Sequence, residues 1–179
     1  MDGQILHSPV FGGEYKRVYT YGDGSCFFHS LAVAMYGKAY EELKKKEQVE
    51  LGHMVRQRIL EEGYREFLEE QGFLGIEGVV QPEEAGQVDV QADEAIINFA
   101  AKRLNLNLCI LVSPTEKYVR EVDSTKPWIL LGWIKRMHFE PIVYVNEYST
   151  FAVENELINV SDQHYMLACS DPMVKWIKK

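Results

Sequence analysis

Basic residues are scarce in this sequence, and their scarcity argues against a protein that binds nucleic acids. Lys and Arg together number 19 against 27 Asp and Glu, so the formal net charge of the 179 residues is −8. Proteins that bind nucleic acids gain most of their affinity from basic side chains that neutralise phosphates. The one comparable run, Lys44–Lys46, is bracketed by glutamates. DNA and RNA are therefore not expected partners.

Cysteines and long apolar runs are also few. The three cysteines (Cys26, Cys109 and Cys169) cannot build a disulfide framework and are not spaced for zinc, which favours a reducing compartment. The N-terminus lacks the basic start and the apolar stretch of about 7–15 residues that mark a signal peptide. No segment reaches the roughly 20 apolar residues of a membrane span. We therefore expect a soluble, cytoplasmic protein with no membrane partner.

The composition that remains is that of a globular protein. Hydrophobic residues make up 46% of the chain and aromatic residues 12%, which is enough for a sizeable core and excludes a disordered chain. A length of 179 residues suits one compact domain, so we expect a single domain over residues 1–179. Predicted helices come first and predicted strands follow, which indicates an α+β or mixed α/β fold.

Hydrophobic periodicity predicts mainly helices in the first part of the chain. A short strand at 17–20 precedes a helix over 26–35, and Gly37 is suited to end that helix. The charge-rich region 40–70 is predicted to form two helices, or one helix bent at Gly63.

The second part is predicted to contain a long loop, one helix and most of the strands. A loop over 72–90 has a length that is uncommon unless the loop is functional or mobile. Asp93 is a suitable cap for the next helix. The strand at 106–112 is almost continuously apolar and should be central in its sheet. Further strands are expected at 118–122, 128–134 and 138–145, with a short one near 165–168.

Cys26 lies where a glycine-rich turn, Tyr21-Gly22-Asp23-Gly24-Ser25, enters an apolar helix. A thiolate at a helix N-terminus is stabilised by the positive end of the helix dipole and by unpaired N–H groups. The same N–H groups can face an oxyanion that develops during acyl transfer. A cysteine at the start of an apolar helix is, however, more often a small core residue. The spacing alone leaves both interpretations open.

The run Gly22-Asp-Gly-Ser-Cys-Phe-Phe-His-Ser-Leu-Ala32 resembles the cysteine motif of the ovarian-tumour-domain (OTU) deubiquitinases, in which Asp-Gly-x-Cys precedes a helix with an aromatic residue. Ser25 stands where the family commonly has Asn, and only its backbone N–H is expected to matter. Residues 92–108 resemble the family's middle helix and strand, with Gln91 where a tryptophan is usual. Residues 129–142 resemble the closing strand with the catalytic histidine.

This resemblance covers residues 17–145 and implies an OTU-like α+β domain with a small mixed central sheet flanked by helices. Residues 146–179 would then be a C-terminal extension that does not align with the family. The implied activity is hydrolysis of the isopeptide or peptide bond after the C-terminal glycine of ubiquitin or a ubiquitin-like modifier, through a thioester. The implied partners are ubiquitin, such modifiers and their conjugates. The protein would act as a monomer, without metal or cofactor.

The resemblance also implies roles for individual residues. Cys26 would be the nucleophile, and Asp23 would shape the loop that carries it. The backbone N–H groups of Gly24, Ser25 and Cys26 would form the oxyanion hole. Three other possibilities stay open: an OTU-like protease that processes a viral polyprotein, a non-catalytic ubiquitin-binding module, and an interaction domain that uses residues 147–179.

The nucleophile needs a base, and the five histidines differ in their suitability. We expect no proton transfer from three of them: His7 in an unstructured start, His53 solvated on a charged helix, and His29 packed in the core. His138 is followed two residues later by Glu140, which a strand places on the same face.

A carboxylate in that position can orient the imidazole, as the acid does in catalytic triads. The resemblance assigns the base to His138 and the orienting role to Glu140, where the family usually has Asp or Asn. His164 is the alternative base, with Asp162 two residues before it. Because Pro141 has no N–H to donate, the strand of His138 is expected at a sheet edge or with a bulge.

Overall fold

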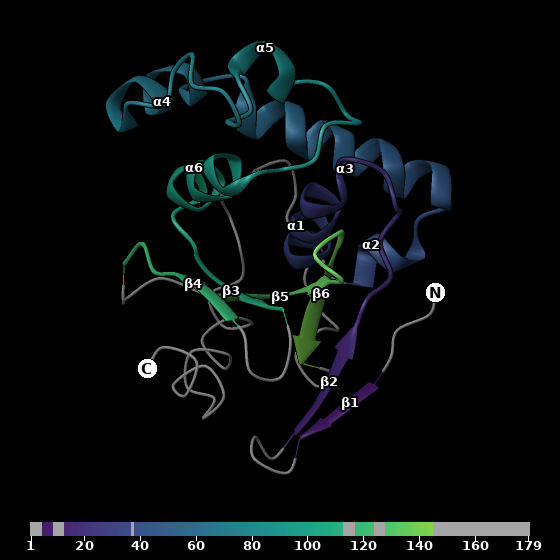
Figure 1. Ribbon diagram of the computed structural model, residues 1–179. Helices are drawn as coiled ribbons and strands as arrows, with labels where there is room; N and C mark the ends of the chain where they lie inside the picture. The colour runs from purple at the N-terminus through teal and green to yellow at the C-terminus, as the bar shows by residue number, and fades with distance from the viewer. Residues whose placement is uncertain (1–4, 9–12, 37, 113–116, 124–127, 145–179) are drawn as a thin grey trace.

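The computed structural model describes residues 5–8, 13–36, 38–112, 117–123 and 128–144 (Figure 1). The helices are α1 (Cys26–Tyr36), α2 (Lys38–Glu42), α3 (Lys45–Leu60), α4 (Tyr64–Gln71), α5 (Pro82–Ala85) and α6 (Glu94–Leu104). The strands are β1 (Ile5–Ser8), β2 (Gly13–Arg17), β3 (Asn107–Leu111), β4 (Lys117–Arg120), β5 (Trp128–Ile134) and β6 (His138–Tyr144). None of the helices in these ranges combines the length and apolarity that a membrane crossing requires.

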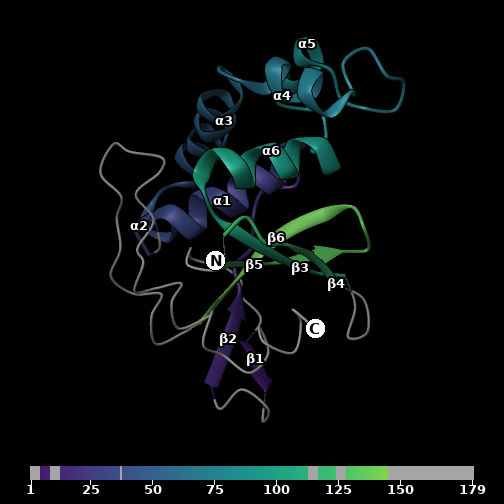
Figure 2. The same cartoon turned by 90° about the vertical axis from the view of Figure 1, so that its left-hand side faces the viewer.

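One mixed sheet joins the strands in the order β1-β2-β6-β5-β3-β4. β3 and β5 run parallel, and the other neighbouring pairs run antiparallel. Figures 1 and 2 show the described helices on one side of this sheet, with α1 close to it and α4 and α5 farthest away. The predicted α+β class with a small mixed sheet is confirmed.

Helix α1 lies between β6 and α3, with both of which it makes extensive contacts. Its residues from Cys26 to Ala34 are all buried, because the sheet covers one side of the helix and other helices cover the rest. Phe27 packs edge-on against Phe139 of β6, with ring centroids 5.6 Å apart. The residue that begins α1, Cys26, is thereby held against β6.

The boundaries of several predicted elements are confirmed and others are wrong. Asp93 caps α6, accepting a hydrogen bond from Ile96 N over 2.9 Å. The chain divides at Gly63, which has φ +89° and precedes α4. β3 is central, between β5 and β4. The first strand was misplaced, because residues 13–17 rather than 17–20 form β2.

The predicted loop over 72–90 is ordered by side-chain hydrogen bonds and contains the short helix α5. Gln81 donates from its amide to three carbonyl oxygens of the loop and accepts from Gly75 N over 2.7 Å. Tyr64 donates to Val80 O over 2.6 Å, which fastens the loop to α4. These bonds order the first half of the loop and attach it to α4.

The prediction that Pro141 places its strand at a sheet edge is wrong, because β6 lies between β2 and β5. β2 pairs with β6 only from Ile142 to Tyr144. Pro141 therefore needs no N–H on that side, and its carbonyl accepts from Val18 N over 3.0 Å. The predicted strand at 165–168, the extension 146–179, Gly37 and Cys169 lie outside the described residues.

Candidate active site

The thiol of Cys26 is covered by protein but has polar neighbours. Cys26 is only 1% exposed, as expected of a core residue. Its Sγ accepts a hydrogen bond from Phe139 N over 3.4 Å and lies 3.8 Å from Oε1 of Gln91. Cys109 is equally buried, within β3. The Cys26 thiol therefore lies among hydrogen-bonding groups rather than in a purely apolar environment.

His138 begins β6 and brings an imidazole to this thiol from 112 positions along the chain. Its Nε2 lies 3.3 Å from Oγ1 of Thr20. Because the Thr20 hydroxyl donates to Phe139 O over 2.7 Å, Oγ1 accepts from His138, which therefore carries its proton on Nε2. The other ring nitrogen, Nδ1, is left for Cys26.

The charge of His138 is stabilised by its neighbours. A hydrogen bond with Cys26, followed by one with Glu140, raises the pKa of His138 to about 9 against the opposing effect of burial. Glu140 is buried, and its Oε2 lies 3.6 Å from His138 Nε2, which is an ion-pair distance. The two side chains share one face of β6 as the sequence predicts. His164, the alternative base, lies outside the described residues.

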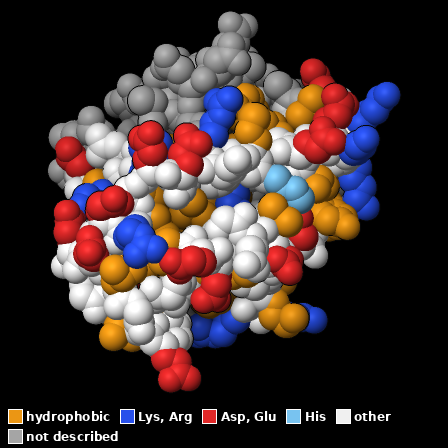
Figure 3. Space-filling view, turned by 90° about the horizontal axis from the view of Figure 1, so that it is seen from above, with side chains coloured by type: hydrophobic (Ala, Val, Ile, Leu, Met, Phe, Trp, Pro, Cys, Tyr) orange, Lys and Arg blue, Asp and Glu red, His pale blue; other side chains and the backbone are white. Residues whose placement is uncertain are grey.

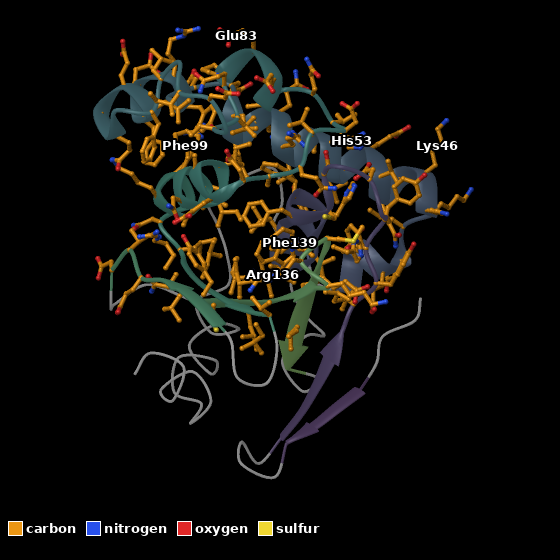
Figure 4. All side chains as sticks on the ribbon, viewed as in Figure 1. Lys46, His53, Glu83, Phe99, Arg136 and Phe139 are labelled. Carbon is orange, nitrogen blue, oxygen red and sulfur yellow. The ribbon has the colours of Figure 1, made fainter. Side chains whose placement is uncertain are left out.

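Asp23 is clamped by two histidines. Its Oδ2 accepts from His53 Nε2 over 2.7 Å, and its Oδ1 accepts from His29 Nε2 over 2.9 Å. Burial raises the pKa of Asp23, but the hydrogen bond of His53 and the charge of His29 outweigh it and hold the pKa below its usual value. His53 therefore binds Asp23, and the expectation that it is merely solvated is wrong. Figure 4 shows His53 on α3, above the layer that contains Phe139.

His29 is fully buried, as expected of a packed residue, and burial lowers its pKa. Its ring lies against the backbone of α3 at Gly52, where an added Cβ would come within 1.7 Å of Nδ1. Glycine at position 52 thus allows the ring to reach Asp23. His7, expected in an unstructured start, lies in strand β1.

One of the three predicted oxyanion-hole donors is already engaged in the structure. Asp23 Oδ1 accepts a hydrogen bond from Ser25 N over 2.9 Å. Ser25 N–H is therefore occupied, and it serves to hold the turn. Within the described ranges, the N–H groups of Gly24 and Cys26 have no acceptor. Two of the three predicted donors thus remain free for an oxyanion.

Arg56, on α3, donates hydrogen bonds to the cysteine loop. Its Nη1 donates to Gly24 O over 3.2 Å and to Ser25 Oγ over 3.1 Å, while Nε donates to Ala85 O over 2.8 Å. Burial lowers the pKa of Arg56, but a guanidinium keeps its charge in proteins. Arg56 therefore places a positive charge against the loop. No sequence signal separates it from the other charged residues of α3.

The segment after α5 covers the cysteine loop. Gly24 lies against the backbone of Asp89, and a Cβ at position 24 would come within 2.1 Å of it. Ser25 donates from Oγ to Val88 O over 2.7 Å. The expectation that only the backbone of Ser25 matters is therefore wrong, because its side chain joins this segment to Arg56. Sequence analysis also missed Thr20, an isolated hydroxyl beyond a strand.

One group of side chains has the composition of a metal site. Potential ligand atoms of Asp23, His29 and His53 lie within 4.8 Å of one another. The hydrogen bonds from both imidazoles to the carboxylate already account for this arrangement.

On the face seen in Figure 3, acidic and basic side chains are interspersed with small apolar patches.

Comparison with known proteins gives no match to a family model or to a curated protein sequence. Solved structures do resemble the chain. The OTU domain of OTUD1 has a TM-score of 0.55 at 21% identity, over 72% of this chain and 85% of that one. An ovarian tumor (OTU) domain in complex with ubiquitin has a TM-score of 0.56 at 14% identity, over 90% and 87%. The Hazara virus OTU bound to ubiquitin has a TM-score of 0.51 at 20% identity, over 73% of this chain and 81% of that one. The chain therefore has the fold of OTU domains.

Proposed function

We propose that this protein is a cysteine protease of the OTU type, which hydrolyses the bond after the C-terminal glycine of ubiquitin or a ubiquitin-like modifier. The observation that supports this most is that β6 brings His138 to Cys26: Phe139 N, next in the chain, lies 3.4 Å from Cys26 Sγ, and Glu140 Oε2 lies 3.6 Å from the His138 imidazole. Two of the solved structures with this fold are complexes with ubiquitin. The protein would act as a monomer in the cytoplasm, or in the host cytoplasm if its source is viral or bacterial.

In the proposed reaction, His138 accepts the Cys26 proton, or the two residues rest as an ion pair. The thiolate attacks the scissile carbonyl, so that a C–S bond forms and an electron pair moves to oxygen. The N–H groups of Gly24 and Cys26 bind the oxyanion, in the loop that Asp23 holds. The intermediate collapses, the C–N bond breaks, and His138 protonates the leaving amine. His138 then activates water to hydrolyse the thioester. No metal or cofactor takes part.

A cavity whose lining residues are close in sequence to the catalytic pair is a candidate site for the tail of the modifier. Its volume is about 460 Å³, and its lining includes Ala92 and Phe139, the chain neighbours of Gln91 and His138. Trp133, Glu94 and Arg136 also line it, so it offers aromatic surface and charged groups of both signs. These features suit an extended tail with apolar and charged side chains.

The burial of Cys26 supports a second candidate, a module that binds ubiquitin without cleaving it. A scissile carbonyl must reach a side chain that is 1% exposed, which requires Gln91 or another covering residue to move. A ubiquitin with a C-terminal thiol-reactive group separates the two functions. Covalent capture by the natural protein but not by Cys26→Ala is expected of the hydrolase. Binding without capture is expected of the module.

The base is tested by hydrolysis of ubiquitin conjugates. His138→Ala should abolish hydrolysis, whereas His164→Ala should leave most of it. The opposite pattern would transfer the role of base to His164. Probes built on other modifiers that end in Gly-Gly, run in parallel, define the range of substrates.

A further inference from the structure

Gln91 brings a carboxamide to the thiol. Its Oε1 lies 3.8 Å from Cys26 Sγ, within the range of a weak hydrogen bond to sulfur. Gln91 is exposed, so a substrate can approach the same position. Once Cys26 loses its proton, an amide oxygen facing the thiolate is repelled. A half-turn about the last side-chain bond replaces that oxygen with the amide NH2, which is a donor.

The segment that carries Gln91 is held at both sides. Asp89, two residues earlier, packs on Gly24, and the carbonyl of Val88 accepts from Ser25. Two residues later, Asp93 caps α6 and also accepts from Val80 N over 2.8 Å. The amide of Gln91 therefore approaches Cys26 from a segment whose backbone position is determined by the cysteine loop itself.

The backbone of the cysteine loop offers one hydrogen-bond donor fewer than predicted, and the amide of Gln91 can replace it. Ser25 N–H, the middle donor of the predicted three, is bonded to Asp23. Of the three predicted loop donors, the N–H groups of Gly24 and Cys26 would then be left for an oxyanion beside Sγ. Oxyanion holes in other enzymes combine backbone N–H groups with Asn or Gln side chains.

We propose that Gln91 is a further catalytic residue, whose side-chain NH2 donates to the oxyanion formed when Cys26 attacks the scissile carbonyl. This inference rests on the proposed hydrolase function. As the C–S bond forms and the carbonyl electron pair moves to oxygen, that oxygen accepts from Gly24 N, Cys26 N and Gln91 Nε2. When the C–N bond breaks, the carbonyl re-forms and the amine takes its proton from His138. Gln91 itself exchanges no proton.

The test compares Gln91→Met with the natural protein, using ubiquitin with a C-terminal fluorogenic amide. Methionine has a similar length but no N–H donor. Loss of one oxyanion-hole donor should lower kcat by about 10²-fold, with little change in KM. Gln87→Met is the matched control, because Gln87 is an exposed glutamine of the same segment, and it should retain the natural kcat.

A second measurement separates a catalytic role from a structural one. Alkylation of Cys26 by iodoacetamide forms no oxyanion, so its rate and pH profile should be the same in Gln91→Met as in the natural protein. Gln91→Glu should be slower than Gln91→Met at neutral pH, because a carboxylate repels the oxyanion. As the pH falls and the carboxyl group becomes protonated, it can donate a hydrogen bond, so the rate of Gln91→Glu should rise relative to that of Gln91→Met.

The outcomes distinguish this inference from the proposed function. If the natural protein hydrolyses the amide and Gln91→Met does so equally fast, the role of Gln91 is refuted and the hydrolase stands. If kcat and the alkylation rate fall together, Gln91 acts on the thiol instead, and the inference is also wrong. If the natural protein neither hydrolyses the substrate nor is captured by the reactive ubiquitin, both proposals fail.

Discussion

His53 Nε2 lies 2.7 Å from Asp23 Oδ2, which fastens the cysteine loop to helix α3 from 30 positions along the chain. With Oδ2 held in this way, Oδ1 remains directed at Ser25 N and His29. The loop geometry thus depends on a carboxylate that two imidazoles orient.

Asp23→Ala should impair both the stability and the proposed activity. It leaves the buried Nε2–H of His29 without its acceptor, which costs about 1–3 kcal/mol in the free energy of unfolding. The substitution should also lower kcat, because the turn before Cys26 loses the hydrogen bond from Ser25 N to Asp23 that holds it. His53→Ala should cost less, since Asp23 keeps its bonds to His29 and Ser25. Urea unfolding and hydrolysis measure both effects, with Glu50→Ala, exposed on the same helix, as the control. Equal behaviour of Asp23→Ala and the control would contradict the clamp.

Arg56→Met should strongly destabilise the protein. The substitution leaves the carbonyl oxygens of Gly24 and Ala85 without their donor, and each buried unpaired acceptor costs about 1–3 kcal/mol. The stability of Arg56→Lys should lie between those of the natural protein and Arg56→Met, because one ammonium cannot reproduce the planar set of donors. Denaturant midpoints test this order. Arg58→Met, at an exposed position of α3, should leave the midpoint nearly unchanged; a similar loss there would indicate a general effect of removing charge.

The pH dependence should reflect the imidazolium of His138. Its pKa is raised from 6.5 to about 9, first by Cys26 and then by Glu140. The stabilisation from these contacts is therefore fully present below pH 6.5 and is lost as the pH rises through about 9. Hydrolysis should decline over the same alkaline range, because the ion pair loses its cation.

NMR titration of the His138 ring identifies the causes of this shift. Cys26→Ala should lower the pKa of His138 more than Glu140→Gln does, because the hydrogen bond with Cys26 is the larger cause. Glu140→Gln should also move the alkaline decline of kcat/KM to lower pH. An unshifted pKa in both variants would show that neither group contacts the ring in solution.

Thr20→Val should lower kcat while retaining the shape of the side chain. The Thr20 hydroxyl donates to Phe139 O and accepts from His138 Nε2. Its loss removes a partner that holds the imidazole, and leaving a buried carbonyl unpaired costs about 1–3 kcal/mol. Thr20→Ser keeps the hydroxyl and should retain most of the activity and stability. If valine and serine behave alike, the hydroxyl has no role in positioning the base.

Local sequence predicted the elements that carry the site because their signals are short-range. The glycine turn before Cys26 and the cap at Asp93 depend on neighbouring residues alone. Alternation along a strand was enough to place His138 and Glu140 on one face. The sheet position of Pro141 was not predictable in this way, because it depends on where β2 stops pairing.

By itself, the sequence determined the α+β class, the helix that begins at Cys26 and the shared face of His138 and Glu140, since periodicity and turn chemistry act between near neighbours. Only the tertiary structure decided that Arg56, His53 and Thr20 support the cysteine loop and the imidazole. It also decided that Ser25 N–H is occupied and that Gln91 faces the thiol. These contacts join segments that are distant in the chain, and a buried polar group is recognisable only once its partner has been brought to it.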